Sequence, residues 1–540
     1  MHIGLDLDNT LVGYDRVFAQ AAQQQGLLPQ GWQGGKQKLR KLLRSRERGD
    51  EDWQLLQGQV YGALMYQAEL MPGAGWFLLH CRAKDVRVSV VSHKTRYSPK
   101  DPERVPLREM ALCWMTNKGF FDPDRFGISP ESVYFEDTRE QKVKRISALG
   151  CTHFVDDLLE VFSEPEFPIH VARILFGTEE LGEDLNEGLV SCSDWALIGS
   201  MLLGCESEQD LTAIAQGLMP ELAINRCQSV AGGGNSRVYH LLCSGREPLA
   251  FKRYPTAAGD SRDRLGTETK ACNFLRAQGA VQVAAVAAIG EENHVAAFEW
   301  VKGERLDAPN HDDLSQLIEF VSQLDSLRHK KGARTFTPAS EACFSGQEIV
   351  RQIQFRRDRL EQLAVEFPGL LSYLRQDFDP IFGRLRNWAR HNWPTDQTFN
   401  GELPTQYRTL SPSDLGFHNA LRAESGALRI IDLEYFGWDD PVKLTSDFCW
   451  HPGMTLDQRM RDEWIRATIQ IFTRDRSFMA RLRAAYPLYG LRWAMIVLNP
   501  FLMSPLNSSV PTRILNAQLE KSTNLCRKAA LLIEDERYKF

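Results

Sequence analysis

The chain has 540 residues, too many for one ordinary domain, and this length favours two to four domains. A hydrophobic content of 43%, a charged content of 25% and a net charge of −6 are typical of a globular protein and argue against nucleic acid as its main partner. No apolar run reaches the roughly 18 residues of a membrane helix, and no signal peptide is visible. The 11 Cys residues form no C-x-x-C pair. We therefore expect a cytoplasmic protein with reduced thiols.

The first stretch, residues 2–5, predicts a short buried strand, and two alternating carboxylates follow it. Asp6 and Asp8 stand in the pattern D-x-D-x-T. One carboxylate can attack phosphorus while the other transfers a proton, provided that a metal offsets their repulsion. The same residue types also form ordinary turns after strands. The motif alone leaves both interpretations open.

A long helical segment follows, and we interpret residues 12–85 as an insertion over the strand ends. It contains a run of basic residues, for which a solvated helix face balanced by nearby acids is the favoured interpretation. The alternative is a lid that attracts an anionic substrate. The run consists of Lys36, Lys38, Arg40, Lys41, Arg44, Arg46 and Arg48.

Three later stretches carry candidate side chains near the ends of predicted elements. Ser92 ends an apolar strand, where a hydroxyl can hold a phosphate oxygen. Lys142 falls in the first turn of a predicted helix, where a cation is unfavourable against the helix dipole, so a functional role is indicated. Lys144 is the competing candidate. Another strand ends in Asp156 and Asp157, which need a cation or hydrogen bonds.

In this order the four motifs resemble the haloacid dehalogenase (HAD) superfamily of phosphohydrolases, over residues 1–204. The resemblance implies a Rossmann-like parallel α/β sheet with a helical cap insertion. It also implies that Asp6 forms an aspartyl-phosphate, that Asp8 is the general acid and base, and that Ser92 and Lys142 steady the phosphoryl group. Mg²⁺ would be bound by Asp6 and Asp8 together with Asp156 or Asp157, and the substrate would be a small phosphorylated metabolite.

The second half begins after a segment without a clear core pattern, residues 205–222, which we interpret as a linker to a domain at 223–540. A turn between two predicted strands would let a backbone approach a phosphate closely. It contains Gly232, Gly233, Gly234, Asn235 and Ser236. Lys252 lies inside the next strand and needs a partner. Glu268, on the following predicted helix, is the candidate.

The most informative stretch of the second half surrounds Asp414, and it follows a long, mostly helical region. Asn419 lies five residues further on, and a short strand later ends in Asp432. A base, an Asn and a second Asp that hold Mg²⁺ form the arrangement that phosphoryl transfer from ATP requires.

This ordered set resembles the small-molecule kinases of the aminoglycoside phosphotransferase and choline kinase group, over residues 223–540. The resemblance implies an α+β, bilobal protein-kinase-like fold in which the glycine turn, Lys252 and Glu268 serve ATP. Asp414 would be the base, and Asn419 and Asp432 would bind Mg²⁺. One departure is Pro412, which stands where the group usually has His. His418 is interpreted as a local packing residue.

Three functions are compatible with these motifs. The favoured one is a bifunctional enzyme that hydrolyses a phosphomonoester and also phosphorylates a small hydroxylated metabolite, such as a sugar or amino alcohol. The second is a phosphatase whose kinase-like half only senses a nucleotide. A non-catalytic interaction protein ranks last, because idle carboxylates clustered in two sites would destabilise the fold.

Overall fold

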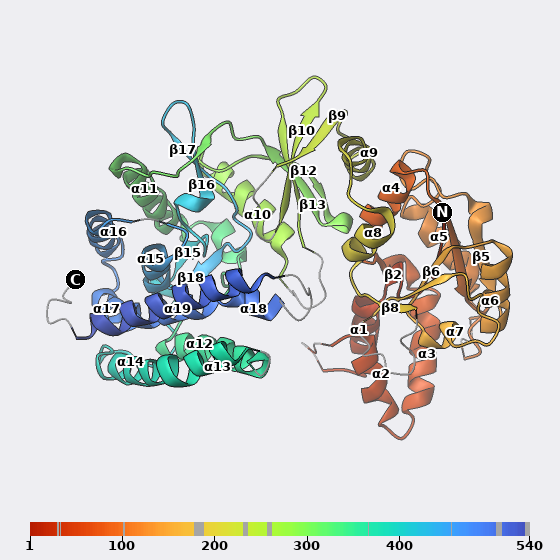
Figure 1. Cartoon of the computed structure of the whole chain (residues 1–540), viewed down its shortest axis with the longest axis horizontal. Helices are drawn as coiled ribbons and strands as arrows, with labels where there is room; N and C mark the ends of the chain where they lie inside the picture. The colour runs from red at the N-terminus through yellow and green to blue at the C-terminus, as the bar shows by residue number, and fades with distance from the viewer. Residues whose placement is uncertain are drawn as a thin grey trace. The chain divides into compact units, whose positions relative to one another are not determined.

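The computed structural model describes residues 1–29, 32, 34–100, 103–177, 188–230, 236–255, 262–364, 367–454, 456–503 and 510–534. The chain forms two compact units. The first comprises Met1–Ser261 and Val286–Trp300, and the second comprises Arg262–Ala285 and Val301–Phe540 (Figure 1). The first unit is therefore discontinuous in sequence.

The first unit contains a parallel sheet in the order β5–β4–β1–β6–β7–β8, here called the N-terminal sheet. Its strands are β1 His2–Leu5, β4 Arg87–His93, β5 Val133–Glu136, β6 His153–Asp156, β7 Ala172–Leu175 and β8 Leu189–Ser191. Because β4 and β6 lie on opposite sides of β1, the chain reverses its direction of winding there. Open α/β sheets bind ligands at such a switch point. The predicted parallel sheet is confirmed.

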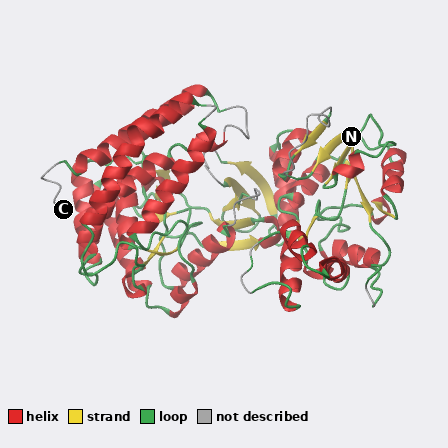
Figure 2. Cartoon of the chain, turned by 90° about the horizontal axis from the view of Figure 1, so that it is seen from below, coloured by secondary structure: helices red, strands yellow, loops and turns green. Residues whose placement is uncertain are grey.

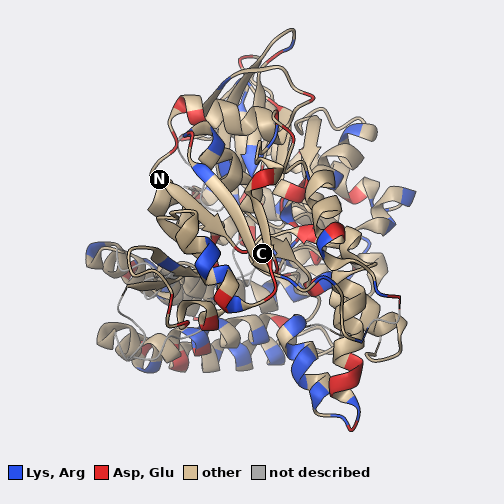
Figure 3. Ribbon diagram, turned by 90° about the vertical axis from the view of Figure 1, so that its right-hand side faces the viewer, with Lys and Arg blue, Asp and Glu red and all other residues tan. Residues whose placement is uncertain are grey.

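Three helices are inserted directly after β1 and pack on one another: α1 Asp15–Gln24, α2 Lys36–Arg44 and α3 Gly49–Tyr61. Two short antiparallel strands, β2 Val12–Gly13 and β3 Glu69–Leu70, close the insertion at its base. Figure 3 shows Lys and Arg in blue and Asp and Glu in red along the chain.

Helix α4, Ala74–Ala83, belongs to the part of the chain that we expected inside the insertion, but it packs elsewhere. It lies against β4, α8 (Trp195–Leu203) and α9 (Glu208–Leu218). Residues 74–81 are buried on every face of the helix. A helix that is apolar all round belongs in a core. The remaining helices of this part are α5 Leu107–Asn117, α6 Arg139–Ala148 and α7 Leu159–Phe162.

Most of the expected linker, residues 205–222, is the packed helix α9. Ser207 and Asp210 form a capping box at its start. Leu211, Ile214 and Leu218 are buried, and their spacing is that of one helix face. This pattern was present in the sequence but was too short to stand out there.

The first unit also contains an antiparallel sheet in the order β12–β13–β11–β10–β9. Its strands are β9 Ile224–Ser229, β10 Arg237–Cys243, β11 Leu249–Arg253, β12 Val286–Gly290 and β13 Val295–Glu299. The predicted glycine turn connects β9 to β10. Of its residues Ser236 is buried, whereas Gly232 to Asn235 lie outside the described residues.

The second unit is mainly helical (Figure 2). Its helices are α10 Arg264–Ala277, α11 His311–Leu327, α12 Gly346–Leu363, α13 Pro368–Ser372, α14 Asp379–His391, α15 Pro441–Trp450, α16 Gln458–Ile471, α17 Phe478–Ile496, α18 Asn499–Met503 and α19 Thr512–Leu532. Its short strands are β14 Glu304–Arg305, β15 Thr409–Ser411, β16 Ala420–Arg422, β17 Leu428–Ile430 and β18 Gly437–Asp439. Within the described part of the chain, no helix combines the length and the apolar composition needed to cross a bilayer.

Candidate functional site

Three carboxylates meet at the carboxyl ends of β1 and β6. Asp6, Asp156 and Asp157 each place an oxygen within 4.8 Å of the others. Asp6 and Asp156 are buried, and Asp157 is half-buried. Since β1 and β6 are parallel neighbours, their ends open at the same edge of the sheet. The structure therefore brings together side chains that the sequence separates by 150 residues. We call these residues the carboxylate cluster.

Lys142, on α6, neutralises part of this cluster. Its Nζ lies 2.5 Å from Asp6 Oδ1 and 2.6 Å from Asp156 Oδ2. Burial acts to lower the pKa of Lys142, but Asp156 and Asp6 outweigh burial and raise it. The competing candidate, Lys144, is exposed and pairs with Glu140. Of the two lysines, the structure places Lys142 at the site.

The carboxylate cluster suits a hard divalent cation. Burial and then the neighbouring Asp156 raise the pKa of Asp157 to about 7, and burial raises the pKa of Asp6 despite Lys142. The three carboxylates of the cluster therefore carry more negative charge, when ionised, than Lys142 alone can neutralise. Mg²⁺ prefers such oxygen ligands, so the predicted ligands Asp6, Asp156 and Asp157 fit this ion.

Asp8 lies outside the cluster and has partners of its own. Tyr14 donates its hydroxyl to Asp8 Oδ1 at 2.5 Å, and Lys94 Nζ lies 2.9 Å from both oxygens of Asp8. Burial acts to raise the pKa of Asp8, but Lys94 and Tyr14 outweigh it and lower the pKa. Asp8 is thus an ionised neighbour of the cluster, and its side chain is not among the grouped ligand atoms. In the sequence, Lys94 is one of several basic residues that follow Ser92, and nothing there distinguishes it from its neighbours.

Ser92 is buried in β4, one residue before that strand ends. The parallel register pairs Leu5 of β1 with Val90, so Ser92 stands just beyond the end of β1, close to the level of Asp6. This placement is compatible with its predicted role toward a phosphate oxygen.

One residue of the basic run departs from the rest. Lys36 Nζ donates to Asn9 Oδ1 at 2.9 Å and to the Tyr61 hydroxyl at 2.6 Å. Asn9 in turn donates to Asp157 Oδ2 at 3.1 Å. The other six basic residues of the run are exposed, as the favoured interpretation expected. The Lys36 side chain is directed from the insertion toward the carboxylate cluster. The sequence could not reveal this, because Lys36 is one of seven similar basic residues in the run.

A second group of polar side chains surrounds Asp414, in the second unit. Asn419 donates its side-chain amide to the Asp414 carbonyl at 2.9 Å and to Asp414 Oδ2 at 3.2 Å. His418 Nε2 lies 3.2 Å from Asp414 Oδ1. The interpretation of His418 as a packing residue was therefore incomplete, because its ring reaches the carboxylate. Burial acts to raise the pKa of Asp414, but His418 outweighs it and lowers the pKa.

The remaining acids of this region form a cluster of their own. Glu268, Asp432 and Glu434 place carboxylate oxygens within 4.8 Å of one another. Asp432 has a left-handed backbone with φ of 64°, a conformation that non-glycine residues adopt mostly at functional sites and turns. The backbone N–H of Ile431, next to Asp432, donates to the Asn419 carbonyl at 3.0 Å. This bond joins the chain segments of the two predicted Mg²⁺ ligands, and the oxygen-rich set fits the ion.

The loop before Asp414 is anchored without the usual His. Lys443 Nζ donates to Ser413 Oγ at 2.9 Å, and Ser413 Oγ donates to the Ser340 carbonyl at 2.9 Å. Lys443 is itself buried between Asp439, at 2.9 Å, and Asp447, at 3.2 Å. Pro412 therefore sits in a loop whose position is fixed by other side chains.

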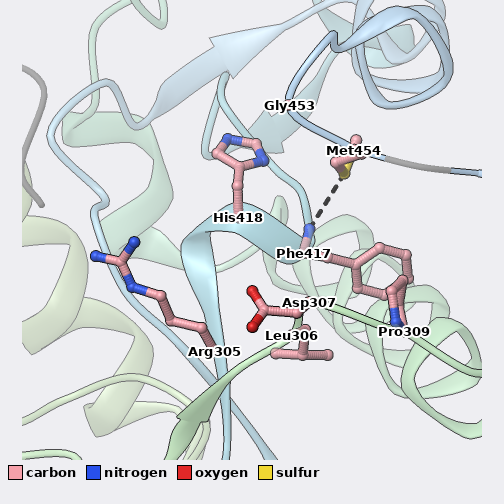
Figure 4. Close-up of a pocket in the computed structure, with 8 residues that line it drawn as sticks. All are labelled: Arg305, Leu306, Asp307, Pro309, Phe417, His418, Gly453 and Met454. Carbon is pink, nitrogen blue, oxygen red and sulfur yellow. Dashed lines mark hydrogen bonds between the residues drawn. The ribbon is translucent and has the colours of Figure 1, made fainter.

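A cavity of about 270 Å³ opens beside this group (Figure 4). His418, whose ring also contacts the Asp414 carboxylate, borders it. Its remaining lining mixes charged and apolar side chains: Arg305, Leu306, Asp307, Pro309, Phe417, Gly453 and Met454. A space of this size, with a lining that mixes charged and apolar side chains, suits part of a small polar molecule.

Lys252 is buried in β11, with its Nζ 5.0 Å from the centre of the Tyr254 ring. Glu268 belongs to the second unit, where its carboxylate accepts a hydrogen bond from the Leu433 N–H at 3.3 Å. The pairing of Lys252 with Glu268 stays a prediction.

Comparison with protein families gives a match in the second half of the chain. Residues 226–482 match the family model described as "Phosphotransferase enzyme family" (APH). This stretch is an APH-like phosphotransferase domain. It contains Lys252, Glu268, Asp414, Asn419 and Asp432. No match was found among curated proteins. The HAD resemblance of the N-terminal part stays a prediction.

Solved structures similar to this chain include three small-molecule kinases. A spectinomycin phosphotransferase in complex with ADP and spectinomycin is 12% identical, with a TM-score of 0.43 over 60% of this chain and 98% of its own. A Plasmodium vivax ethanolamine kinase is 13% identical, with a TM-score of 0.42 over 60% and 91%. A Cryptosporidium parvum choline kinase is 10% identical, with a TM-score of 0.38 over 58% and 90%. These scores are low, so the assignment of the APH-like domain rests on the family match.

Proposed function

We propose that this chain is a bifunctional phosphoryl-transfer enzyme of the cytoplasm. Residues 1–204 would hydrolyse a small phosphomonoester, residues 205–222 would connect the halves, and residues 223–540 would transfer phosphate from ATP to a small hydroxylated metabolite. The observation that carries the phosphatase half is the meeting of Asp6, Asp156 and Asp157 around Lys142. The kinase half is supported by the family match.

In the phosphatase half, the Asp6 carboxylate attacks phosphorus and the ester P–O bond breaks, which leaves an aspartyl-phosphate on Asp6. Water then attacks phosphorus, the bond between phosphorus and the Asp6 oxygen breaks, and inorganic phosphate leaves while Asp8 takes a proton from that water. The pKa of Asp8, which Lys94 and Tyr14 lower against burial, suits the base step. The leaving oxygen takes its proton from Asp8 in the first step, so Asp8 must enter that step protonated, which requires it to lose its contact with Lys94. Ser92 and Lys142 hold the phosphoryl oxygens.

Mg²⁺, held by Asp6, Asp156 and Asp157, would offset the negative charge shared by these carboxylates and the phosphoryl group. Lys142 already bridges two of these residues. A bound Mg²⁺ would take over part of that neutralising role, so the Lys142 ammonium would be available to the phosphoryl oxygens.

In the kinase half, Asp414 accepts the proton of the acceptor hydroxyl, whose oxygen attacks the γ-phosphorus of ATP, and ADP leaves. The glycine turn, Lys252 and Glu268 would serve the ATP phosphates, and Asn419 and Asp432 would hold Mg²⁺. We assign the cavity beside His418 to the acceptor, such as a sugar or an amino alcohol. The acceptor and donor classes follow from the resemblance, and the cavity supports a small molecule.

A second candidate function is a phosphatase with a nucleotide-sensing kinase-like half. Pro412, in place of the usual His, favours it. The anchoring of the same loop by Lys443 and Ser413 favours turnover, because the loop keeps a support.

The deciding experiment compares the chain with its Asp6→Asn and Asp414→Asn variants. Each is incubated with Mg²⁺ and a panel of phosphomonoesters, and separately with ATP and a panel of sugars and amino alcohols. Products are identified by mass spectrometry. The bifunctional proposal expects phosphate release to fail only in Asp6→Asn and product phosphorylation to fail only in Asp414→Asn. If Asp414→Asn alters ATP binding but no phosphorylated product ever forms, the sensor function replaces the kinase.

A further inference from the structure

The antiparallel sheet has two faces with different neighbours. Side chains alternate along a strand, and the register pairs Tyr239 with Phe251 and Val238 with Lys252. Phe251 and Arg253 therefore share the face opposite to that of Lys252. The face of Phe251 belongs to one continuous hydrophobic core that also contains Leu5 and Leu7 of the N-terminal part.

Trp76 makes the central contact between helix α4 and the face of the antiparallel sheet that carries Phe251. Its ring stacks with Phe251, with centroids 6.4 Å apart and an interplanar angle of 12°, and with Tyr239 at 5.8 Å and 30°. The guanidinium of Arg253 lies 4.0 Å above the same ring. Trp76 Nε1 also donates to Glu206 at 3.1 Å, and its side chain is 5% exposed. Four partners thus fix the indole.

The contact continues on both sides of Trp76. A side-chain carbon built on Gly75 would lie only 2.0 Å from Asn293 Oδ1, so α4 approaches the turn between β12 and β13 as closely as a glycine permits. Lys118 and Arg125 contact Glu292 of that turn. On the other side, α9 packs on β9 (Figure 1). There the Cys227 N–H donates to Thr212 Oγ1 at 2.9 Å.

From these contacts we propose that Trp76, in the phosphatase half, is a positioning residue for the kinase reaction. Arg253 is the immediate neighbour of Lys252 on β11, and it is clamped from the opposite face by the indole. A displacement of Arg253 moves the backbone that carries the Lys252 ammonium. Errors of about 1 Å in the placement of a phosphate-binding group can lower a rate by roughly 100-fold. The proposal rests on the proposed contact of Lys252 with ATP.

The same contacts make the N-terminal half the second layer of the kinase-like sheet. An antiparallel sheet with one apolar face needs such a layer. In this chain α4 and α9 supply it. Residues 223–540 alone would therefore expose Phe251, Tyr239 and Leu241 to water.

The test uses the full-length chain and the affinity for the Mg²⁺ complex of AMP-PNP, measured by titration calorimetry. Arg253→Met keeps an apolar stem against the indole but removes the guanidinium, and Trp76→Phe keeps an aromatic ring. Trp76→Ala removes the clamp. We expect Trp76→Ala and Arg253→Met to raise the Kd at least about tenfold, and Trp76→Phe to restore it to within about threefold of the parent value. Lys84→Met is the matched control. It removes an ion pair with Asp210 just after the end of the same helix, eight residues beyond Trp76, leaves the contacts of the indole in place and should leave the Kd unchanged.

The Lys252→Ala variant separates this proposal from the proposed function. If Lys252→Ala leaves AMP-PNP binding intact, the assignment of Lys252 fails and the role of Trp76 fails with it. If Lys252→Ala weakens binding while Arg253→Met and Trp76→Ala bind normally, Trp76 is only a packing residue and the inference is overturned. Near-UV circular dichroism shows which variants keep their fold, and a Trp76→Ala protein that does not fold leaves Arg253→Met to decide.

Discussion

The carboxylate cluster and the group around Asp414 both hold acidic side chains, but they do so with different partners and at different degrees of burial. Asp6 and Asp156 expose 7% and 0% of their side chains and are held by a buried lysine. Asp414 exposes 32% of its side chain and contacts an imidazole and an amide. A buried acid needs a full opposite charge, whereas a half-exposed acid needs only hydrogen bonds. The first site is therefore the more sensitive to loss of a partner.

The largest expected effects separate the two reactions. Asp6→Asn should reduce phosphate release by at least about 1,000-fold, because the attacking atom is lost. It should leave ATP-dependent phosphorylation unchanged, and Asp414→Asn should show the reverse pattern. Initial rates of both reactions for both variants check this. Loss of both activities in either single variant would mean that the two regions form one site.

Removal of Lys142 should reveal how strongly the cluster depends on its charge. Lys142→Met leaves buried carboxylates without their cation and should lower the free energy of unfolding by about 3–5 kcal/mol. Saturating Mg²⁺ should recover part of this loss if the cluster binds the ion. Urea unfolding with and without Mg²⁺ measures both effects. Lys144→Met, at an exposed position on the same helix, is the control and should change little.

His451, which lies beside the group around Asp414, makes the stability of that region depend on pH. It stacks on His418 with ring centroids 3.8 Å apart, and burial followed by His418 lowers the pKa of His451 to about 4. In the unfolded chain the pKa of His451 is near 6.5, so between pH 4 and pH 6.5 the unfolded chain binds a proton at this residue more readily than the folded chain does. Stability should therefore fall as pH drops from 6.5 to 4, by at most about 3 kcal/mol.

The pH prediction is checked by unfolding midpoints of the parent and His451→Gln between pH 7.5 and pH 4.5. His451→Gln should lose less stability on acidification than the parent. His391→Gln, at an exposed position, should behave as the parent. Equal acid sensitivity in all three proteins would show that His451 does not contribute.

The smallest expected effect concerns the insertion. Lys36→Met removes a cation that faces the cluster through Asn9, and should raise the KM for an anionic phosphomonoester by roughly tenfold with a smaller change in kcat. Lys38→Met changes an exposed residue of the same run and is the control. If both variants behave alike, the whole run acts as a diffuse positive surface rather than through Lys36.

Much of the first site was predictable because it follows from strand order. Acids that end parallel strands meet at one edge of a sheet, so Asp6, Asp156 and Asp157 could be placed together from sequence. Lys142 could be recognised because it lies in the first turn of a helix, where the helix dipole disfavours a positive charge. The local motif likewise singled out Asp414 and Asn419, five residues apart, and the structure joins the two by hydrogen bonds.

Most of the site residues that the sequence did not identify have roles that depend on the direction of the side chain. Lys94 and Lys36 lie in stretches rich in charge, where sequence does not distinguish an inward lysine from a solvated one. His418 belongs to the same class, since only the loop geometry brings its ring to Asp414. Helix α9 was missed because its apolar face spans only Leu211 to Leu218, too short a pattern to compete with its polar surroundings.

The discontinuity of the first unit has a consequence for biosynthesis. The chain leaves this unit at residue 261 and returns only at Val286, to add β12 and β13. A ribosome must therefore complete about 300 residues before the antiparallel sheet can close on α4. Until then the turn between β12 and β13, which lies against α4 near Gly75, is missing from the unit. Expression at lower temperature, or with a chaperone that shields nascent chains, should improve the yield of the intact protein.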